Sequence, residues 1–530
     1  MQILSGRRTS RSLPARAGAG ALLGLMVLMT LGGAASGEGV SRLAREAPPA
    51  PSSARSAGST TRSEAPKTGL HLGLETRNRG SRPGPPNIIW FMADDLGYGT
   101  VGAYGQRRIR TPHVDRLARE GMRFTSAYAG GPVCLPSRCS LMTGRHLGRA
   151  ACRNNGAQYH LLDADVTVAE RLKAAGYATG LFGKWGLGVE DTPGRPDRQG
   201  FDEWAGQLDQ VHAHFQYPYW IWDNGRRVPL PQNERGGRGA YVTDWVQRRA
   251  LDFVRRHADR PFFLYAACTL PHVELVVPDD SERPYRGLFP REAVLDPRPG
   301  YLGSEDGITT FAGMVGRMDR YVGELLALLR DLNLEQDTLV IFTSDNGPLN
   351  GGKDQAWTRL SDYFGARGPF RGYKGELYEG GIRVPFIARL PGRIPAGSTA
   401  DYPVAFWDFL PTACSLAGVP VGTETDGVSY AAFDPQHDPA PGRALYWEAP
   451  ASSGSGVARQ AVRQGHWKLH RSMSRGLELY DLAGDPAESR DLAADHPVVA
   501  ARLLGLLDRL HTAPRPYPAR PTSGIRQFVR

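Results

Sequence analysis

Five continuous apolar runs, separated by helical patterns, constrain the fold of these 530 residues more than any other feature. The runs cover residues 87–93, 178–182, 261–267, 339–343 and 384–390, and each is typical of a strand buried on both faces. Helical patterns lie between them at residues 168–175, 244–256, 309–332 and 406–417. Strands that alternate with helices predict an α/β fold in which helices flank a large, mainly parallel central sheet.

The chain changes character after about residue 435. Short strand patterns follow at residues 443–448, 458–463, 467–471 and 477–481, and a helical pattern covers residues 497–511. We expect a small C-terminal antiparallel sheet with one packed helix. The predicted domains are therefore a large α/β domain over residues 85–435, a small α+β subdomain over residues 436–515 and a tail over residues 516–530.

The N-terminal 84 residues differ in composition from the rest of the chain. Four arginines precede an apolar stretch at residues 21–31, and small residues follow at 32–36. This order is typical of a cleavable signal peptide over residues 1–36 and predicts a periplasmic or secreted protein. The apolar stretch is shorter than the roughly 20 residues that a membrane span needs, so we expect no stable membrane anchor. Residues 37–84 are rich in Ala, Ser, Arg, Gly and Pro, which predicts a disordered linker.

The distribution of charge excludes one broad class of function. The formal net charge is +10, but residues 1–82 hold 12 Lys and Arg against 4 Asp and Glu, a net of +8. The remaining +2 falls on residues 83–530, so this part is not a basic nucleic-acid binder. The five cysteines are an odd count and predict no disulfide framework, although they leave room for one disulfide.

Polar side chains follow two of the predicted strands at the point where each strand ends. Asp94 and Asp95 come directly after the first strand, and Asp345 and Asn346 follow the strand at residues 339–343. Ligands bind at the carboxyl ends of strands in open α/β sheets, and adjacent carboxylates repel one another unless a cation or solvent stabilises them. These oxygen ligands suit Ca²⁺ or Mg²⁺ rather than zinc. An exposed strand-end turn is the alternative for each motif taken alone.

Cys134 lies in the sequence Cys-Leu-Pro-Ser-Arg over residues 134–138. Pro136 favours a helix start, because it lacks the N–H group that would be unpaired in the first turn. Cys134 would then lie just before the helix, where free N–H groups and the helix dipole stabilise an oxyanion. Arg138 lies on the same helical face and would reach back to the same group. This arrangement suits attack on a tetrahedral oxyanion ester; the alternative is a loop cysteine beside a helix cap.

Three basic residues complete the set of candidates. Lys184 and His272 each follow a predicted strand, and Lys374 lies in a Gly-Tyr-Lys-Gly turn. Such residues are usually a solvated charge or part of a turn, but here they lie at the end of the sheet where the carboxylates lie. The lysines would neutralise negative charge that develops on an ester. His272 would donate a proton to the departing oxygen as a general acid.

Four further motifs resemble those of a known family. They are Ile-Ile-Trp-Phe-Met-Ala-Asp-Asp-Leu-Gly-Tyr-Gly at residues 88–99, Thr-Pro-His-Val-Asp-Arg-Leu-Ala at 111–118, Glu-Gly-Gly-Ile-Arg-Val-Pro at 379–385 and Leu-Tyr-Asp-Leu-Ala-Gly-Asp-Pro at 479–486. With Cys-x-Pro-x-Arg, this set resembles the type I, formylglycine-dependent sulfatases of the alkaline phosphatase superfamily. The chain is similar to bacterial arylsulfatases from residue 86 to about 510. The resemblance implies an alkaline phosphatase-like fold and a sulfuric ester hydrolase.

The resemblance also implies two non-protein groups. A formylglycine-generating enzyme would convert Cys134 to formylglycine (3-oxoalanine), whose hydrate is the nucleophile. One Ca²⁺ would be held by the converted residue together with four other side chains, Asp94, Asp95, Asp345 and Asn346. The implied reaction is attack of the hydrate on sulfur, release of the alcohol, and elimination of sulfate to restore the aldehyde.

The remaining implied roles belong to basic residues. Arg138 would steady the formylglycine, Lys184 and Lys374 would hold the sulfate, and His272 would protonate the leaving oxygen. One position departs from the family pattern: Gly186 stands where many members have the histidine that assists the elimination step. We expect His214, or failing that His212, to take this base role; the alternative is that both histidines only line the substrate pocket.

We therefore predict an exported enzyme that hydrolyses a sulfate monoester of a small molecule or, more specifically, of a carbohydrate. Aromatic residues at 214–222 would stack on a sugar face or pack in the core, and the segment at residues 348–369 would set specificity. Two alternatives stay open. One is a phosphonate monoester or phosphodiester hydrolase of the same superfamily. The other is a non-catalytic sulfoglycan-binding protein, which is suggested by Gly186 in place of the histidine of many family members.

Overall fold

The computed structural model describes residues 84–296, 300–350, 355–422, 424–450, 457–518, 520 and 528–529. The predicted signal peptide, nearly all of the predicted linker and much of the predicted tail lie outside the described residues. Within the part of the chain that is described, no helix is both long enough and apolar enough to cross a membrane.

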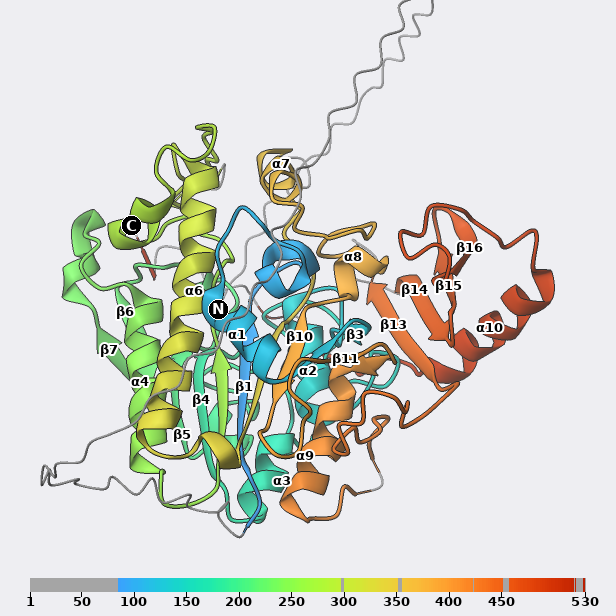
Figure 1. Ribbon diagram of the computed structural model, residues 1–530, viewed down its shortest axis with the longest axis horizontal. Coiled ribbons are helices and arrows are strands. Elements are labelled where there is room, and N and C mark those ends of the chain that lie inside the picture. The colour runs from blue at the N-terminus through green and yellow to red at the C-terminus, as the bar shows by residue number, and fades with distance from the viewer. Residues whose placement is uncertain are drawn as a thin grey trace, which may run out of the picture. The chain divides into compact units, whose positions relative to one another are not determined.

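A ten-stranded sheet forms the centre of the fold, in the order β11-β2-β10-β9-β1-β8-β4-β5-β6-β7 (Figure 1). Its strands are β1 (Asn87–Ala93), β2 (Met122–Phe124), β4 (Ala178–Lys184), β5 (Glu203–Gln207), β6 (Trp220–Asp223), β7 (Arg226–Pro229), β8 (Phe262–Ala267), β9 (Thr338–Ser344), β10 (Phe386–Arg389) and β11 (Ser398–Ala400). The neighbours β9, β1, β8, β4 and β5 are all parallel, which confirms the mainly parallel central sheet. β10, from the last of the five apolar runs, is antiparallel to β9.

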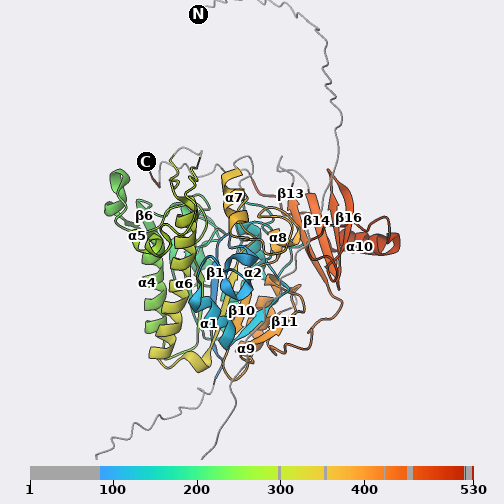
Figure 2. The ribbon, with the colours of Figure 1, turned by 45° about the horizontal axis from the view of Figure 1, so that its top comes forward.

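Helices cover both faces of this sheet (Figures 1 and 2). One face carries α1 (Pro112–Glu120), α4 (Val242–Arg256) and α6 (Gly307–Asp331), and the other carries α2 (Cys134–Thr143), α3 (Val168–Ala174) and α9 (Phe409–Ala417). Side chains of β1 alternate between the two: Trp90 faces the α2 side and Phe91 the α6 side. The shorter elements are β3 (Ala127–Tyr128), β12 (Val404–Ala405), α5 (Asp279–Glu282), α7 (Gln355–Tyr363) and α8 (Glu379–Ile382).

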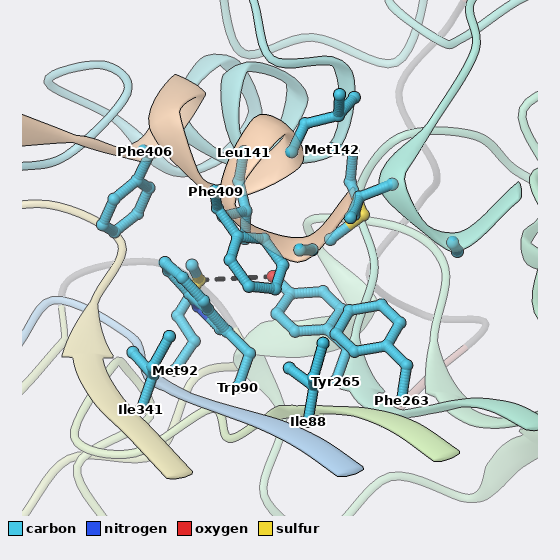
Figure 3. Close-up of a cluster of buried hydrophobic side chains, with 14 of the residues drawn as sticks. Ile88, Trp90, Met92, Leu141, Met142, Phe263, Tyr265, Ile341, Phe406 and Phe409 are labelled. Atoms are coloured by element: carbon cyan, nitrogen blue, oxygen red, sulfur yellow. Dashed lines mark hydrogen bonds between the residues drawn. The ribbon is translucent and has the colours of Figure 1, made fainter. Parts of the chain in front are cut away.

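The helix that begins at Cys134 is fixed by its far end. Figure 3 shows Leu141 and Met142 of α2 in the same buried cluster as Trp90 of β1 and Phe409 of α9. The ring centroids of Trp90 and Phe409 lie 4.3 Å apart. The predicted helix start at Pro136 is wrong by two residues, because Cys134 is already helical and Val133 is the N-cap. Proline is tolerated in the third position because the first four N–H groups of a helix have no partner within it. The buried rear of α2 thus holds its first turn at the edge of the sheet.

The C-terminal part forms the predicted small antiparallel sheet. Its strands are β13 (Ala444–Pro450), β14 (Val457–Gln464), β15 (Trp467–Ser472) and β16 (Gly476–Asp481), and α10 (Pro497–Leu510) packs on it. Leu503 and Leu507 of α10 are buried against Leu469 and Leu479. The exact domain boundaries stay predictions.

Candidate active site

Every side chain that the sequence predicted for the site, His212 apart, lies at the edge of the sheet where the parallel strands end. The groups come from loops and helix starts that are far apart in sequence: Asp94 and Asp95 after β1, Asp345 and Asn346 after β9, Lys184 at the end of β4, His272 after β8, Cys134 and Arg138 on α2, and Lys374 before α8. Because β9, β1, β8 and β4 are parallel neighbours, their carboxyl ends meet at one edge. The topology therefore assembles the site.

Asp94 connects Cys134 to two basic groups. Its Oδ1 lies 3.6 Å from the Cys134 sulfur, and its Oδ2 forms an ion pair with Lys184 Nζ at 2.7 Å. Arg138 Nη2 lies 3.5 Å from the same Oδ2 and donates to Asp345 Oδ2 at 2.8 Å. All five side chains are fully buried. The guanidinium of Arg138 therefore bridges two carboxylates at the floor of the site.

Asp95 gathers a second set of partners. Lys374 Nζ lies 2.7 and 2.8 Å from its two oxygens, and Asn346 Nδ2 donates to Oδ1 at 2.7 Å. His272 Nε2 lies 3.2 Å from Asp95 Oδ2 and 3.1 Å from Lys374 Nζ. The other ring nitrogen of His272 faces the Val273 carbonyl oxygen at 3.1 Å, so Nε2 is the atom that His272 presents to the site.

The three carboxyl groups differ in electrostatic state. Burial would raise the pKa of Asp94, but Lys184, His272 and Arg138 outweigh it and lower that pKa. Burial raises the pKa of Asp345 to about 6, and the neighbouring Asp94 carboxylate adds to that rise. Burial likewise raises the pKa of Asp95, an effect that Lys374 only partly offsets. Two of the three carboxylates are thus destabilised in the charged form by the protein alone.

The site groups side chains that are compatible with a bound metal ion. Ligand atoms of Asp94, Asp95, Cys134 and His272 all lie within 4.8 Å of one another. Asn346 Oδ1 is buried and has no hydrogen-bond partner among the described residues. An orphaned buried oxygen is rare in native proteins and is satisfied when it binds a ligand. Asp345 lies next to these four residues and accepts a hydrogen bond from Arg138 Nε at 3.1 Å.

A cavity of about 260 Å³ opens above this cluster. Cys134, His214, His272 and Lys374 line it, together with residues around 155–159, 186–189 and 208–211. A larger cavity of about 630 Å³ lies elsewhere, around Asp244 and Arg317, but it holds none of the predicted site residues. The smaller cavity is therefore the candidate substrate pocket.

His214 and His212, the two candidates for the base role, lie in different surroundings. The His214 ring stacks on His272 with centroids 4.9 Å apart, and its Nδ1 lies 2.6 Å from the Tyr301 hydroxyl oxygen. His212 is fully buried, its Nε2 lies 3.0 Å from the Trp220 carbonyl oxygen, and it is absent from the residues that line the pocket. His214 is therefore the one placed to act in the pocket.

Two other expectations about the pocket walls change with the structure. Trp222, from the aromatic segment at 214–222, is buried in the core cluster and does not face the pocket. The segment at 348–369 forms helix α7 over much of its length, and its described residues do not line the cavity. Sequence reasoning also missed Gln210, which lies in the pocket wall beside Gly186. The sequence signal for Gln210 was its place at the start of the segment 210–215, which carries His212 and His214.

Comparison with known proteins agrees with this geometry. The sulfatase family model matches residues 86–419, and the model for the C-terminal part of N-sulphoglucosamine sulphohydrolase matches residues 371–512. The N-acetylgalactosamine-6-sulfatase of Canis lupus familiaris is 35% identical over 366 residues, which cover 64% of this chain and 63% of the dog protein.

A bacterial relative and a crystal structure match over a larger share of their length. The N-acetylgalactosamine-6-O-sulfatase of Bacteroides thetaiotaomicron is 29% identical over 521 residues, covering 82% of this chain and 95% of that protein. The crystal structure of Ps i-CgsB in complex with k-i-k-neocarrahexaose superimposes with a TM-score of 0.69 at 28% identity, over 80% of this chain and 92% of that one. The chain belongs to the sulfatase family of sulfuric ester hydrolases.

Proposed function

We propose that this chain is an exported sulfatase that hydrolyses a sulfate monoester of a glycan, with Cys134 converted to formylglycine and one bound Ca²⁺. The observation that carries the proposal is the position of Cys134 within a buried cluster of carboxylates and lysines at the floor of a pocket. Export would depend on residues 1–36, and conversion of Cys134 on a formylglycine-generating enzyme.

The charge balance of the site supports an anionic substrate. Three carboxylates, Asp94, Asp95 and Asp345, face three cationic groups, Arg138, Lys184 and Lys374. The protein groups therefore balance one another, and a bound divalent cation would leave the pocket positive. A positive, water-poor pocket stabilises the negative charge of a sulfate ester and of its transition state.

Each basic group has a distinct task in this proposal. Lys184 and Lys374 hold the sulfate oxygens, and Arg138 steadies residue 134 while it fixes Asp94 and Asp345. In its doubly protonated form His272 would deliver a proton to the leaving oxygen from Nε2, because its Nδ1–H is committed to the Val273 carbonyl oxygen, and the ring would be left neutral. When formed, formylglycine would supply a hydrate hydroxyl as the nucleophile. Asp94, Asp95, Asp345, Asn346 and residue 134 would hold the Ca²⁺.

His214 is proposed as the base that completes turnover. It lines the pocket together with Cys134, and its Nδ1 lies 2.6 Å from the Tyr301 hydroxyl oxygen. His214→Ala should stall turnover with sulfate still bound to the enzyme, which rapid-quench measurement of bound sulfate would detect. Unchanged turnover would show that His214 only lines the pocket.

The glycan substrate is supported by the relatives. Two of them are named for N-acetylgalactosamine 6-sulfate, and a third was crystallised with a neocarrahexaose. The test is sulfate release from a panel of sulfated sugars, N-acetylgalactosamine 6-sulfate first, alongside a phosphonate monoester and a phosphodiester. Faster turnover of the phosphorus esters would favour the alternative hydrolase. Tight binding of a sulfated sugar without any sulfate release would favour a binding protein.

A further inference from the structure

We propose that Cys139 and Cys152 form a disulfide in the exported protein, and that this bond ties the helix of Cys134 to the segment that caps it. The inference goes beyond the proposed function, because it concerns two residues that do not line the pocket and involves neither the sulfate ester nor formylglycine. It shares with that function only the export of the chain into a compartment where disulfides form and persist.

The two thiols are neighbours in the core. Cys139 lies on α2, and Cys152 follows Gly144, the residue with a left-handed backbone at which this helix ends. Both side chains are fully buried in the hydrophobic cluster on the α2 face of the sheet. The Cys152 N–H donates to Cys139 Sγ at 3.4 Å, and a hydrogen bond from the Cys152 side chain lowers the pKa of the Cys139 thiol. An S–S bond is about 2.0 Å long, so it needs a shift of two side chains already in contact and no change of secondary structure.

The other three cysteines have different surroundings. Cys134 lies in the pocket, and Cys268 belongs to the buried cluster on the α6 face of the sheet. Cys414 lies on α9, where burial raises the pKa of its thiol. The fold therefore brings Cys139 and Cys152 together as a pair and leaves Cys134 available for conversion.

The reaction that links the pair is thiol–disulfide exchange with a protein disulfide as the oxidant. Before folding buries the two side chains, the thiolate of one cysteine attacks a sulfur of the oxidant, forms a mixed disulfide and expels one oxidant thiolate. The thiolate of the other cysteine then attacks the sulfur of the first and expels the second oxidant thiolate. In total, Cys139 and Cys152 lose two protons and two electrons, and the oxidant disulfide is reduced to a dithiol.

The bond would hold the start of the helix on which the nucleophile lies. The first N–H groups of a helix have no partner within it, and here the Leu135 N–H donates to Asn155 Oδ1 at 3.0 Å. Asn155 also lines the pocket. Because Asn155 follows Cys152 closely in sequence, a bond from Cys152 to Cys139 restricts where this cap can lie. The bond also closes a loop over residues 140–151, which constrains the unfolded chain.

The first test is a peptide map of protein from the source organism, alkylated under denaturing conditions and digested without reductant. Trypsin cleaves after Arg138, which separates Cys139 from Cys134. We expect residues 139–145 and 150–153 as one linked species, about 2 Da lighter than the two free peptides together, which dithiothreitol separates.

The remaining cysteines serve as internal controls for this map. Cys268 and Cys414 should each carry the alkylating group, since the inference assigns them no partner. Alkylation of both Cys139 and Cys152, or a link from either one to a different cysteine, would overturn the inference. This measurement uses the wild type, so it does not depend on the folding of a variant.

The second test measures thermal unfolding with and without dithiothreitol. Reduction should lower the melting temperature of the wild type by about 3 °C, because a disulfide that closes a short loop stabilises a protein mainly by constraining its unfolded chain. Cys139→Ala/Cys152→Ala should melt at the same temperature in both buffers. Cys414→Ala removes a buried thiol of the same cluster and should respond to the reductant as the wild type does. A wild type that does not respond, or a double variant that does, would contradict the bond.

Hydrogen exchange tests the tie between the bond and the helix cap. The Leu135 N–H should exchange about tenfold faster in Cys139→Ala/Cys152→Ala than in the oxidised wild type, since local opening of the capped turn becomes easier. The N–H groups of α10 offer a control and should exchange equally in both proteins. Equal exchange at Leu135 would show that the bond does not hold the cap, against the inference.

The outcomes separate this inference from the proposed function. If the protein releases sulfate but the map shows free thiols at Cys139 and Cys152, the proposed function stands and the inference fails. If the map shows the linked peptides in a protein that releases no sulfate from any ester, the inference stands and the proposed function fails.

Discussion

Two clusters of charged side chains in this molecule both lie largely in the interior but differ in how their charges are paired. The nucleophile cluster consists of Asp94, Asp95, Arg138, Lys184, Asp345 and Lys374, and the anchor cluster consists of Glu379, Arg383, Lys468, His470 and Glu488. Both draw charged residues from distant parts of the chain. Their difference lies in how completely the charges are paired.

The anchor cluster is satisfied by its own residues. Glu379 Oε1 accepts from Lys468 Nζ at 2.7 Å, and its Oε2 accepts from the Tyr128 hydroxyl at 2.6 Å and from Arg383 at 3.1 Å. Glu488 pairs with Lys468 at 3.0 Å and accepts from the Glu379 N–H at 2.6 Å. Burial opposes ionisation of Glu379, but Lys468 and Arg383 lower its pKa to about 2. This cluster joins the region of α8 to the C-terminal sheet.

The nucleophile cluster keeps unsatisfied groups and faces a cavity. Asn346, which donates to Asp95 of this cluster, has an Oδ1 without a partner among the described residues. Two of the three carboxyl groups of the cluster, those of Asp95 and Asp345, have a raised pKa. The contrast teaches that burial of charge does not identify a site. A site is indicated where buried polar atoms stay unpaired beside space for a ligand.

The largest effect on turnover is expected when one carboxylate of the nucleophile cluster is replaced by an uncharged side chain of the same shape. Asp95→Asn should lower sulfate release at least about 10³-fold, because it removes a proposed Ca²⁺ ligand and the partner of Lys374. The unfolding free energy of the Ca²⁺-free protein should fall by less than in the Lys468→Met variant described below, since burial already disfavours the charge on Asp95. Steady-state kinetics measure the rate of sulfate release, and urea unfolding of the same preparation measures the unfolding free energy. Full activity with lost stability would reverse the assignment of the two clusters.

Removal of one partner from the anchor cluster should do the opposite. Lys468→Met leaves Glu379 and Glu488 without their shared cation, and a buried charge without a partner destabilises a protein by about 3–5 kcal/mol. Urea unfolding measures the loss. Turnover per folded molecule, assayed where the variant is folded, should stay near that of the wild type. A large loss of turnover in folded Lys468→Met would place the anchor cluster in the catalytic machinery.

The pH dependence of the anchor cluster has a definite sign. The folded-state pKa of Glu379 lies near 2, below its ordinary value of 4.5, so the ionised form stabilises the fold above pH 4.5 and that stabilisation is lost as pH falls toward 2. The shift corresponds to about 3 kcal/mol. The difference in unfolding free energy between the wild type and Glu379→Gln should therefore shrink on acidification. A difference that stays constant from pH 7 to pH 3 would contradict the pairing.

The smallest expected effect is stabilisation by Ca²⁺. At 100 times its Kd, Ca²⁺ should raise the unfolding free energy of the wild type by about 2.7 kcal/mol. Asp95→Asn should lose this gain, and Lys468→Met should retain it. Equal stabilisation of all three proteins would mean that Ca²⁺ binds outside the nucleophile cluster.

Much of this architecture could be predicted from the sequence, because long apolar runs specify buried central strands. β1 has the predicted bounds, and the carboxyl groups after β1 and β9 meet because parallel neighbours end at one edge. The outer strands β6 and β7 were not predicted, since they are short and β7 is mostly exposed and polar. Their pairing depends on contacts between strands rather than on a local pattern.

The site was less predictable where the surroundings of one residue depend on a second residue that lies far away in sequence. Gly186 signalled a missing histidine, but only the pairing of β4 with β5 shows that Gln210 fills the space. The Glu379 motif supported the family resemblance, yet its carboxylate is a structural anchor, because Lys468 reaches it from a distant strand. Residue spacing alone does not show such partners.

The most direct test of this account is the mass of the tryptic peptide that spans residues 124–138, taken from protein produced in its source organism. We expect formylglycine at position 134, trapped by an aldehyde-reactive hydrazide, in protein that binds Ca²⁺ and releases sulfate. Unmodified cysteine in folded, Ca²⁺-loaded protein would contradict it, and the chain would then be a sulfatase relative that binds its ligand without hydrolysing it.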